Sequence, residues 1–211
     1  MDIHKTQPDY TSSLTFILGG ARSGKSDYAL ELARQLAGEQ PVLFVATAQA
    51  GDGEMAERIA RHRSERPDHW QTLEAPRQVG ESIVAYLTQA EQRPVVIVVD
   101  CLTLLVSNVL FAGEDAETEP YLQIQARMDS EVDALLVAAR VANCPMIIVS
   151  NEVGLGIVPL GRISRAYQDL IGRANRQVAA AAEHAIFLLA GIPLDLKALQ
   201  MDMGQSNWRQ G

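Results

Sequence analysis

Cysteine is scarce in this sequence, and no apolar run is long enough to cross a bilayer. The two cysteines, Cys101 and Cys144, stand apart in apolar contexts, which excludes a zinc ribbon or a paired redox motif and favours a reducing, intracellular location. The longest apolar stretch, residues 185–192, is far shorter than the about 20 residues of a membrane-spanning helix. The N-terminal residues lack the basic and apolar regions of a secretory signal. We therefore expect a soluble, cytoplasmic protein with no membrane span.

Positive charge and aromatic residues are also scarce. The 18 Lys and Arg residues face 26 Asp and Glu residues, which gives a formal net charge of −8, and aromatic residues make up 5% of the chain. So acidic a chain is poorly suited to bind a phosphate backbone, and we expect no nucleic-acid partner. The remaining composition is ordinary for a globular protein, and 211 residues bury enough surface to form a core without disulfides or a structural metal.

Short β-branched runs alternate with helical segments along the chain, which is typical of βαβ units around a mostly parallel sheet. Strands are predicted at 14–18, 42–47, 95–100, 146–150 and 185–189, and helices at 26–37, 54–63, 79–91, 102–111, 121–142 and 162–182. We expect an N-terminal tail over 1–13, a single nucleotide-binding catalytic domain over 14–197, and a C-terminal tail over 198–211.

A glycine-rich phosphate loop follows the first predicted strand and opens a helix. Its G-x-x-x-x-G-K-[ST] pattern consists of Gly19, Gly20, Ala21, Arg22, Ser23, Gly24, Lys25 and Ser26. Glycines allow backbone N–H groups to surround phosphates, and the helix N-terminus adds positive charge. Lys25 would neutralise phosphate oxygens and Ser26 would ligate Mg²⁺. The alternative is a tight glycine turn that binds no nucleotide.

Asp100 ends a buried strand, residues 95–100, and is the candidate second Mg²⁺ ligand that a phosphate-loop enzyme needs. Taken alone, a helix cap ahead of the following segment is an equally good interpretation. With the phosphate loop, these features predict an α/β fold of the P-loop NTPase (RecA-like) type, a three-layer sandwich with a mostly parallel central sheet.

Two missing features and one histidine indicate which class of nucleotide-binding protein this is. The N-K-x-D guanine reader of switch GTPases is absent, and a strand-exchange motor would need a basic surface. His62 lies four residues after Arg58 on one helical face, with Arg61, Arg63 and Arg66 near it. This cationic setting favours a neutral, nucleophilic imidazole beside bound phosphates, so His62 is a candidate for a covalent phosphoramidate. The alternative is a solvated basic helix face.

Four motifs together resemble the bifunctional adenosylcobinamide kinase/adenosylcobinamide-phosphate guanylyltransferase family of cobalamin biosynthesis. They are GGARSGKS at 19–26, E-M-x-x-R-I-x-x-H-R-x-x-R-P-x-x-W at 54–70, DCLTLLVSN at 100–108 and SNEVGLGIVP at 150–159. The resemblance runs from about residue 15 to Lys197. It implies an enzyme that phosphorylates adenosylcobinamide with ATP or GTP and then transfers GMP from GTP to the product, giving adenosylcobinamide-GDP and pyrophosphate.

The resemblance also implies roles for individual residues. The guanylylated histidine of the family corresponds to His62, whereas the nearby His69 is interpreted as structural. Catalysis is assigned to His62 and Lys25, and Mg²⁺ to Ser26 and Asp100. Nucleotide contacts are expected from the phosphate loop and from Ala46, Thr47, Ala48, Arg63, Ser64, Glu65, Arg66, Glu74 and Asp100. Adenosylcobinamide and its phosphate are the expected corrinoid partners, and a homotrimer is the expected assembly.

Several features of the sequence also fit other functions. A P-loop kinase of another small alcohol, or a non-catalytic nucleotide-gated binding protein, would share the phosphate loop. The segment 151–159 follows a strand and is either a ligand-binding edge or a plain connection. Four arginines of the last predicted helix, Arg162, Arg165, Arg173 and Arg176, fall on one face and would contact substrate phosphate, a neighbouring subunit or solvent.

Overall fold

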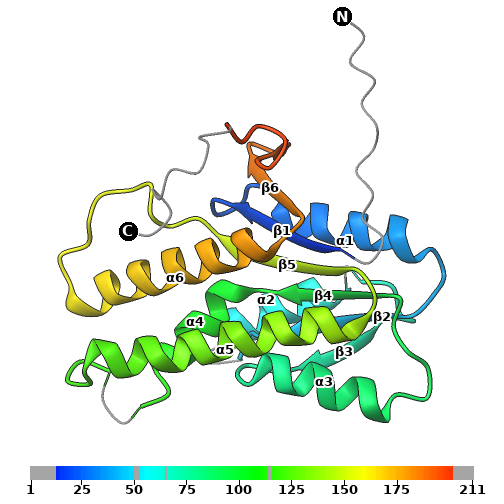
Figure 1. Ribbon diagram of the computed structural model, residues 1–211, viewed down its shortest axis with the longest axis horizontal. Helices are drawn as coiled ribbons and strands as arrows, with labels where there is room; N and C mark the ends of the chain where they lie inside the picture. The colour runs from blue at the N-terminus through cyan, green and yellow to red at the C-terminus, as the bar shows by residue number, and fades with distance from the viewer. Residues whose placement is uncertain (1–12, 50–52, 65, 114–115, 202–211) are drawn as a thin grey trace, which may run out of the picture.

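A computed structural model describes residues 13–49, 53–64, 66–113 and 116–201 (Figure 1). Within these residues a seven-stranded sheet has the order β3-β2-β4-β5-β1-β6-β7. Strands β1 to β6 are parallel, and β7 runs antiparallel to β6. The strands are β1 Leu14–Gly19, β2 Val42–Ala46, β3 Gln71–Glu74, β4 Val96–Asp100, β5 Met146–Asn151, β6 His184–Leu189 and β7 Ile192–Asp195.

Helices cover both faces of the sheet, as the sequence predicts. They are α1 Lys25–Ala37, α2 Gly53–Ser64, α3 Val79–Gln89, α4 Leu102–Leu110, α5 Tyr121–Ala142 and α6 Arg162–Ala181. One core lies between the sheet and α1, and the other joins α3, α4, α5 and α6 to the opposite face. Figure 1 shows α5 and α6 side by side across the front of the molecule. The three-layer α/β architecture is confirmed, and none of the helices in the described part of the chain has the length and apolarity of a membrane span.

The sheet has two strands that the sequence analysis did not predict, and both lie at its edges. Strand β3 reads QTLE and is mostly exposed, so it lacks the apolar run that marks a buried parallel strand. Strand β7 reads IPLD and contains Pro193. Proline has no backbone N–H to donate to a neighbouring strand, so it is tolerated in an edge strand, which has a neighbour on one side only. The predicted tails lie mainly outside the described residues, although the carbonyl of the buried Ser13 accepts a hydrogen bond from the Met146 amide.

The phosphate loop turns sharply between β1 and α1. Gly24 immediately precedes α1 with φ of 86°, a conformation that residues with a Cβ rarely adopt. The loop is also held by the neighbouring β6–β7 hairpin, because the Gly191 amide in its turn donates a hydrogen bond to the Ser23 carbonyl at 3.1 Å. The loop is therefore fixed by its own turn and by the neighbouring hairpin.

Strand register brings the predicted functional segments to one edge of the sheet. Gly19 at the end of β1 pairs with Asn151 at the end of β5, and Ala46 at the end of β2 pairs with Asp100 at the end of β4. In open α/β sheets ligands bind outside the carboxyl ends of the strands. This edge is therefore where a nucleotide site is expected.

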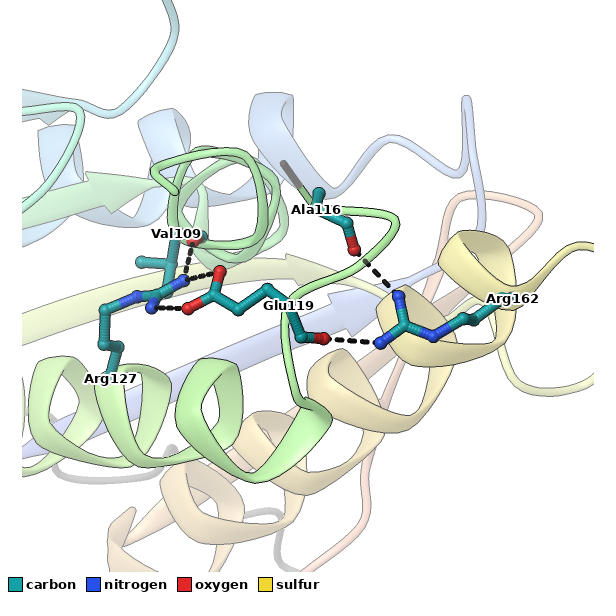
Figure 2. A network of polar contacts seen from close by, with 5 residues as sticks. All are labelled: Val109, Ala116, Glu119, Arg127 and Arg162. Atoms are coloured by element: carbon teal, nitrogen blue, oxygen red, sulfur yellow. Dashed lines mark hydrogen bonds and ion pairs between the residues drawn. The ribbon is translucent and has the colours of Figure 1, made fainter. Parts of the chain in front are cut away.

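The predicted basic face of α6 is largely used for contacts within the chain. Arg173 pairs with Asp129 of α5 through two hydrogen bonds of 2.7 and 3.0 Å, and these hold the pKa of the Asp129 carboxyl below its usual range. Arg162 donates to backbone carbonyls of the α4–α5 connection, where Glu119 pairs with Arg127 (Figure 2). Arg173 and Arg162 therefore hold α6 against α5 and against the connection between α4 and α5.

Candidate active site

A cavity of about 220 Å³ opens at the carboxyl edge of the sheet. It brings together Lys25 and Ser26 of α1, His62 near the end of α2, and Asp100 at the end of β4. These four residues include both predicted catalytic residues and both predicted metal ligands. The full lining comprises Lys25, Ser26, Phe44, Ala46, Ala48, His62, Arg66, Asp100, Cys101, Thr103, Leu104, Asn151 and Tyr167.

The lysine of the phosphate loop is hydrogen-bonded to the backbone of its own loop. The Lys25 ammonium donates a hydrogen bond to the Gly20 carbonyl at 3.3 Å, and the side chain is partly buried. Lys25 is also the first residue of α1, so its charge adds to the positive end of that helix. Together they make this side of the cavity electropositive, which favours anions such as phosphates.

Arg66 fastens the end of α2 to the sheet beside His62. Its Nε donates to the His62 carbonyl at 3.0 Å, and its Nη1 donates to the Thr72 hydroxyl on β3 at 3.1 Å. The guanidinium lies 4.1 Å from the centre of the Phe44 ring on β2, within the range of a cation–π contact. His62 is therefore held at the cavity through its backbone.

Burial and nearby charges of both signs act on the pKa of Arg66. Burial lowers the pKa of its guanidinium from the ordinary value, and Arg63 acts in the same direction, whereas Asp100 and Glu74 oppose the shift. The cavity therefore combines two cationic side chains, Lys25 and Arg66, with one carboxylate, Asp100.

Ser26 and Asp100 offer the oxygen ligands that Mg²⁺ prefers. Both line the cavity beside Lys25. Among the described residues no group of three or more His, Cys, Asp or Glu side chains gathers as a metal cage. One carboxylate and one hydroxyl fit a magnesium ion that takes its other ligands from substrate phosphates and water, as is usual in phosphate-transferring enzymes.

Thr47 lies beneath the cavity and bridges two strand ends. Its side chain is fully buried, and its hydroxyl both accepts a hydrogen bond from the Cys101 amide and donates one to the Cys101 carbonyl, each at 2.8 Å. Its neighbours Ala46 and Ala48 line the cavity, whereas Thr47 does not. The three residues predicted as one contact segment therefore occupy two different environments.

Other predicted nucleotide contacts lie around the cavity rather than in its lining. Ser23 is buried, and Ala21, Arg22, Arg63, Ser64 and Glu74 are exposed, while Glu65 and the side chains of Arg58 and Arg61 lie outside what the structure describes. His69, the rival to His62, is exposed in the turn before Trp70 and is not part of the cavity lining.

Several lining residues were not predicted as site residues from the sequence. Tyr167 and Thr103 enter from α6 and α4, and Phe44 enters from the middle of β2. Burial raises the pKa of the Tyr167 hydroxyl to about 12 and that of the Cys101 thiol to about 11, so both groups are neutral at pH 7. The sequence signals for this part of the wall were the motif at 100–108, which contains Cys101 and Thr103, and the strand end at Asn151.

The arrangement can bind a triphosphate at one side and present an imidazole at another. Known proteins resemble this chain in sequence and in fold. The family model described as cobinamide kinase/cobinamide phosphate guanyltransferase matches residues 15–196. A solved structure described as an ATPase domain has a TM-score of 0.51 and 14% sequence identity, covering 93% of this chain and 74% of that chain, which shows the fold alone.

Two curated relatives match most of the chain. The bifunctional adenosylcobalamin biosynthesis protein CobP of Pseudomonas aeruginosa is 44% identical over 183 residues, which are 86% of this chain and 95% of the relative. The bifunctional adenosylcobalamin biosynthesis protein CobU of Salmonella typhimurium is 39% identical over 188 residues, covering 87% and 99% of the two chains. The chain therefore belongs to the cobinamide kinase/cobinamide phosphate guanyltransferase family.

Proposed function

We propose that this protein catalyses two successive reactions at the cavity described above. In the first, a hydroxyl group of adenosylcobinamide attacks the γ-phosphate of ATP or GTP and releases the nucleoside diphosphate. In the second, GMP moves from GTP to the new phosphate, giving adenosylcobinamide-GDP and pyrophosphate. The names of the family and of its curated relatives support both activities.

In the phosphoryl transfer, the phosphate loop and Lys25 bind and orient the triphosphate. Lys25 and the N-terminus of α1 place positive charge where the transferred group carries negative charge. Ser26 and Asp100 are the residues that would hold Mg²⁺, which supplies further neutralisation of the phosphate oxygens when it is bound.

In the guanylyl transfer, His62 is the proposed nucleophile. An imidazole nitrogen forms a bond to the α-phosphorus of GTP while the bond to the bridging oxygen breaks, and pyrophosphate leaves. A phosphate oxygen of the acceptor then attacks the same phosphorus and displaces His62. The covalent intermediate lets one anionic group depart before the second one arrives, which lowers the repulsion between two phosphates.

The volume of the cavity bears on how much of the acceptor it can enclose. A cavity of about 220 Å³ is smaller than the roughly 300–1,000 Å³ of pockets that enclose a drug-sized ligand, so only the reacting end of the corrinoid enters it.

The β5–α6 connection has exposed apolar side chains: Leu155, Ile157 and Leu160 are 84, 96 and 97% exposed. Such apolar exposure is typical of an interaction surface. We propose that this connection lies at a subunit contact of the homotrimer that the family resemblance implies, and that the enzyme acts in the cytoplasm.

One observation carries the proposal: Lys25, Asp100 and His62 line the same cavity although they come from three different elements. The test measures each reaction in variants of single residues. We expect His62→Ala to lose guanylyl transfer and retain phosphorylation of adenosylcobinamide. Lys25→Ala is expected to slow phosphorylation by about 10²–10³-fold, the usual loss when one group that stabilises transition-state charge is removed.

His69→Ala is the matched control, because His69 is exposed and outside the cavity lining. It should retain both activities. Phosphorylation of a different alcohol but not of adenosylcobinamide would indicate another kinase, and nucleotide binding without turnover would indicate a nucleotide-gated binding protein. Either result would contradict the proposed function.

A further inference from the structure

Asn151 occupies a distinctive place at the carboxyl edge of the sheet. It ends β5, the strand between β1, which leads into the phosphate loop, and β4, which ends in Asp100. Its backbone pairs with Gly19, and the next residue, Glu152, donates its amide to the Gly19 carbonyl at 3.0 Å. Asn151 therefore lies between the two segments that would hold the triphosphate and its metal ion.

The side-chain oxygen of Asn151 is buried and has no hydrogen-bond partner among the described residues. Of the buried side-chain atoms in that condition in the described part of the chain, it is the one whose residue lines the cavity. Leaving a buried acceptor without a donor is costly, and native proteins rarely tolerate it without a reason. A ligand that donates a hydrogen bond inside the cavity would supply the missing partner.

Buried polar side chains fix the backbone at this position. The Asn151 amide donates to the Thr103 hydroxyl at 2.7 Å, and the Asn175 side-chain amide donates to the Asn151 carbonyl at 3.1 Å. Asn175 in turn accepts a hydrogen bond of 2.6 Å from the Ser150 hydroxyl. Thr103, Ser150 and Asn175 are 4, 0 and 6% exposed and come from α4, β5 and α6. A satisfied buried network of this kind holds a group rigidly.

The chemistry of the reactants selects the donor. At neutral pH the terminal phosphate oxygens of a nucleoside triphosphate are acceptors, so they cannot satisfy the Asn151 oxygen. In the phosphoryl transfer, the hydrogen-bond donors of the nucleoside belong to the ribose and the base, which the α- and β-phosphates separate from the transferred γ-phosphate. The remaining reactant at the γ-phosphate is the alcohol, whose hydroxyl group donates one hydrogen bond.

We propose that Asn151 binds the attacking hydroxyl group of the alcohol acceptor, its side-chain oxygen accepting the hydrogen bond from that hydroxyl. This inference rests on the proposed function. The hydroxyl oxygen bonds to the γ-phosphorus, the bond from that phosphorus to the bridging oxygen breaks, and the nucleoside diphosphate leaves with the electron pair. The hydroxyl proton passes to water, because a neutral amide does not take it; Asn151 orients the oxygen lone pair toward phosphorus.

The test compares Asn151→Ala with wild-type protein in the phosphorylation reaction. We expect kcat/KM for the acceptor to fall about tenfold to hundredfold, the loss typical of one buried hydrogen bond to a reacting group. The KM for the triphosphate and the rate of His62 guanylylation in the absence of acceptor should stay unchanged. Because only the backbone of Asn151 joins the buried network, the melting temperature should be no lower than that of wild type.

Two further comparisons sharpen the test. An acceptor analogue whose hydroxyl is replaced by hydrogen should bind wild type and Asn151→Ala equally, whereas the hydroxyl-bearing acceptor should bind wild type more tightly. Glu152→Ala is the control, because Glu152 is the adjacent residue and lies outside the cavity lining. It should leave acceptor kinetics unchanged.

Two outcomes would overturn the inference. Unchanged acceptor kinetics in Asn151→Ala would mean that the buried oxygen is not used. An equal loss in triphosphate binding or His62 guanylylation would mean that Asn151 serves the nucleotide instead. Failure of the wild-type protein to phosphorylate adenosylcobinamide is a different result, because it would contradict the proposed function itself.

Discussion

At the scale of single residues, the cavity depends on groups that lie outside its lining. Thr47 shows this: its hydroxyl joins the end of β2 to the backbone after β4 through two hydrogen bonds with Cys101. Asn108 adds a third tie, since its side-chain amide donates to the Thr47 carbonyl at 2.8 Å. These contacts fix the strand ends that carry Ala46 and Asp100 into the cavity.

Replacing Thr47 by valine should destabilise the protein by about 1–3 kcal/mol, because the buried Cys101 amide loses its acceptor while the side-chain shape is kept. The free energy of unfolding in urea measures the change. Thr47→Ser keeps the hydroxyl and should lose less. A Thr47→Val protein as stable as wild type but with weakened GTP binding would show instead that the hydroxyl serves the nucleotide.

At the scale of elements, the sandwich depends on how closely its helices approach one another. Gly80 near the start of α3 lies against α5, and a Cβ built there would be 2.2 Å from the Ala134 backbone carbon. Gly172 of α6 has no atom within 4 Å of the corresponding position. The two glycines form a matched pair, one at a tight helix contact and one on an open face.

We expect Gly80→Ala to lower the free energy of unfolding by about 1–3 kcal/mol or more, because backbone atoms cannot move aside cheaply. Gly172→Ala should raise it by up to about 1 kcal/mol, since alanine is the better helix former and meets no obstacle. Thermal or urea unfolding of both variants checks this. Equal stability of the two would contradict the close approach of α3 and α5.

The elements also show what a single sequence can predict. In the part of the chain that the structure describes, the five buried strands and the six helices were predictable because apolar runs and helical spacing mark them directly. Strands β3 and β7 were not, because QTLE and IPLD become strands only by pairing at the edges of an existing sheet. Likewise, Tyr167 reaches the cavity from α6 through tertiary packing that no local pattern announces.

At the scale of the whole molecule, an acidic chain builds one locally cationic site. The net charge is −8, yet Lys25, Arg66 and the N-terminus of α1 meet at one edge of the sheet. The phosphate loop, the α2 motif and the strand end at Asp100 were predictable from sequence as separate signals. The parallel register of the sheet brings the phosphate loop and Asp100 to one edge, and His62 of α2 lines the same cavity. We expect the triphosphate and His62 to react within this single cavity.

The most direct measurement is to incubate the protein with GTP labelled in the α-phosphate and Mg²⁺, denature it, and locate any bound GMP by mass spectrometry. We expect one GMP on His62 through an acid-labile phosphorus–nitrogen bond, and no GMP on His62→Ala. GTP binding without a covalent GMP, or GMP on His69, would contradict this expectation.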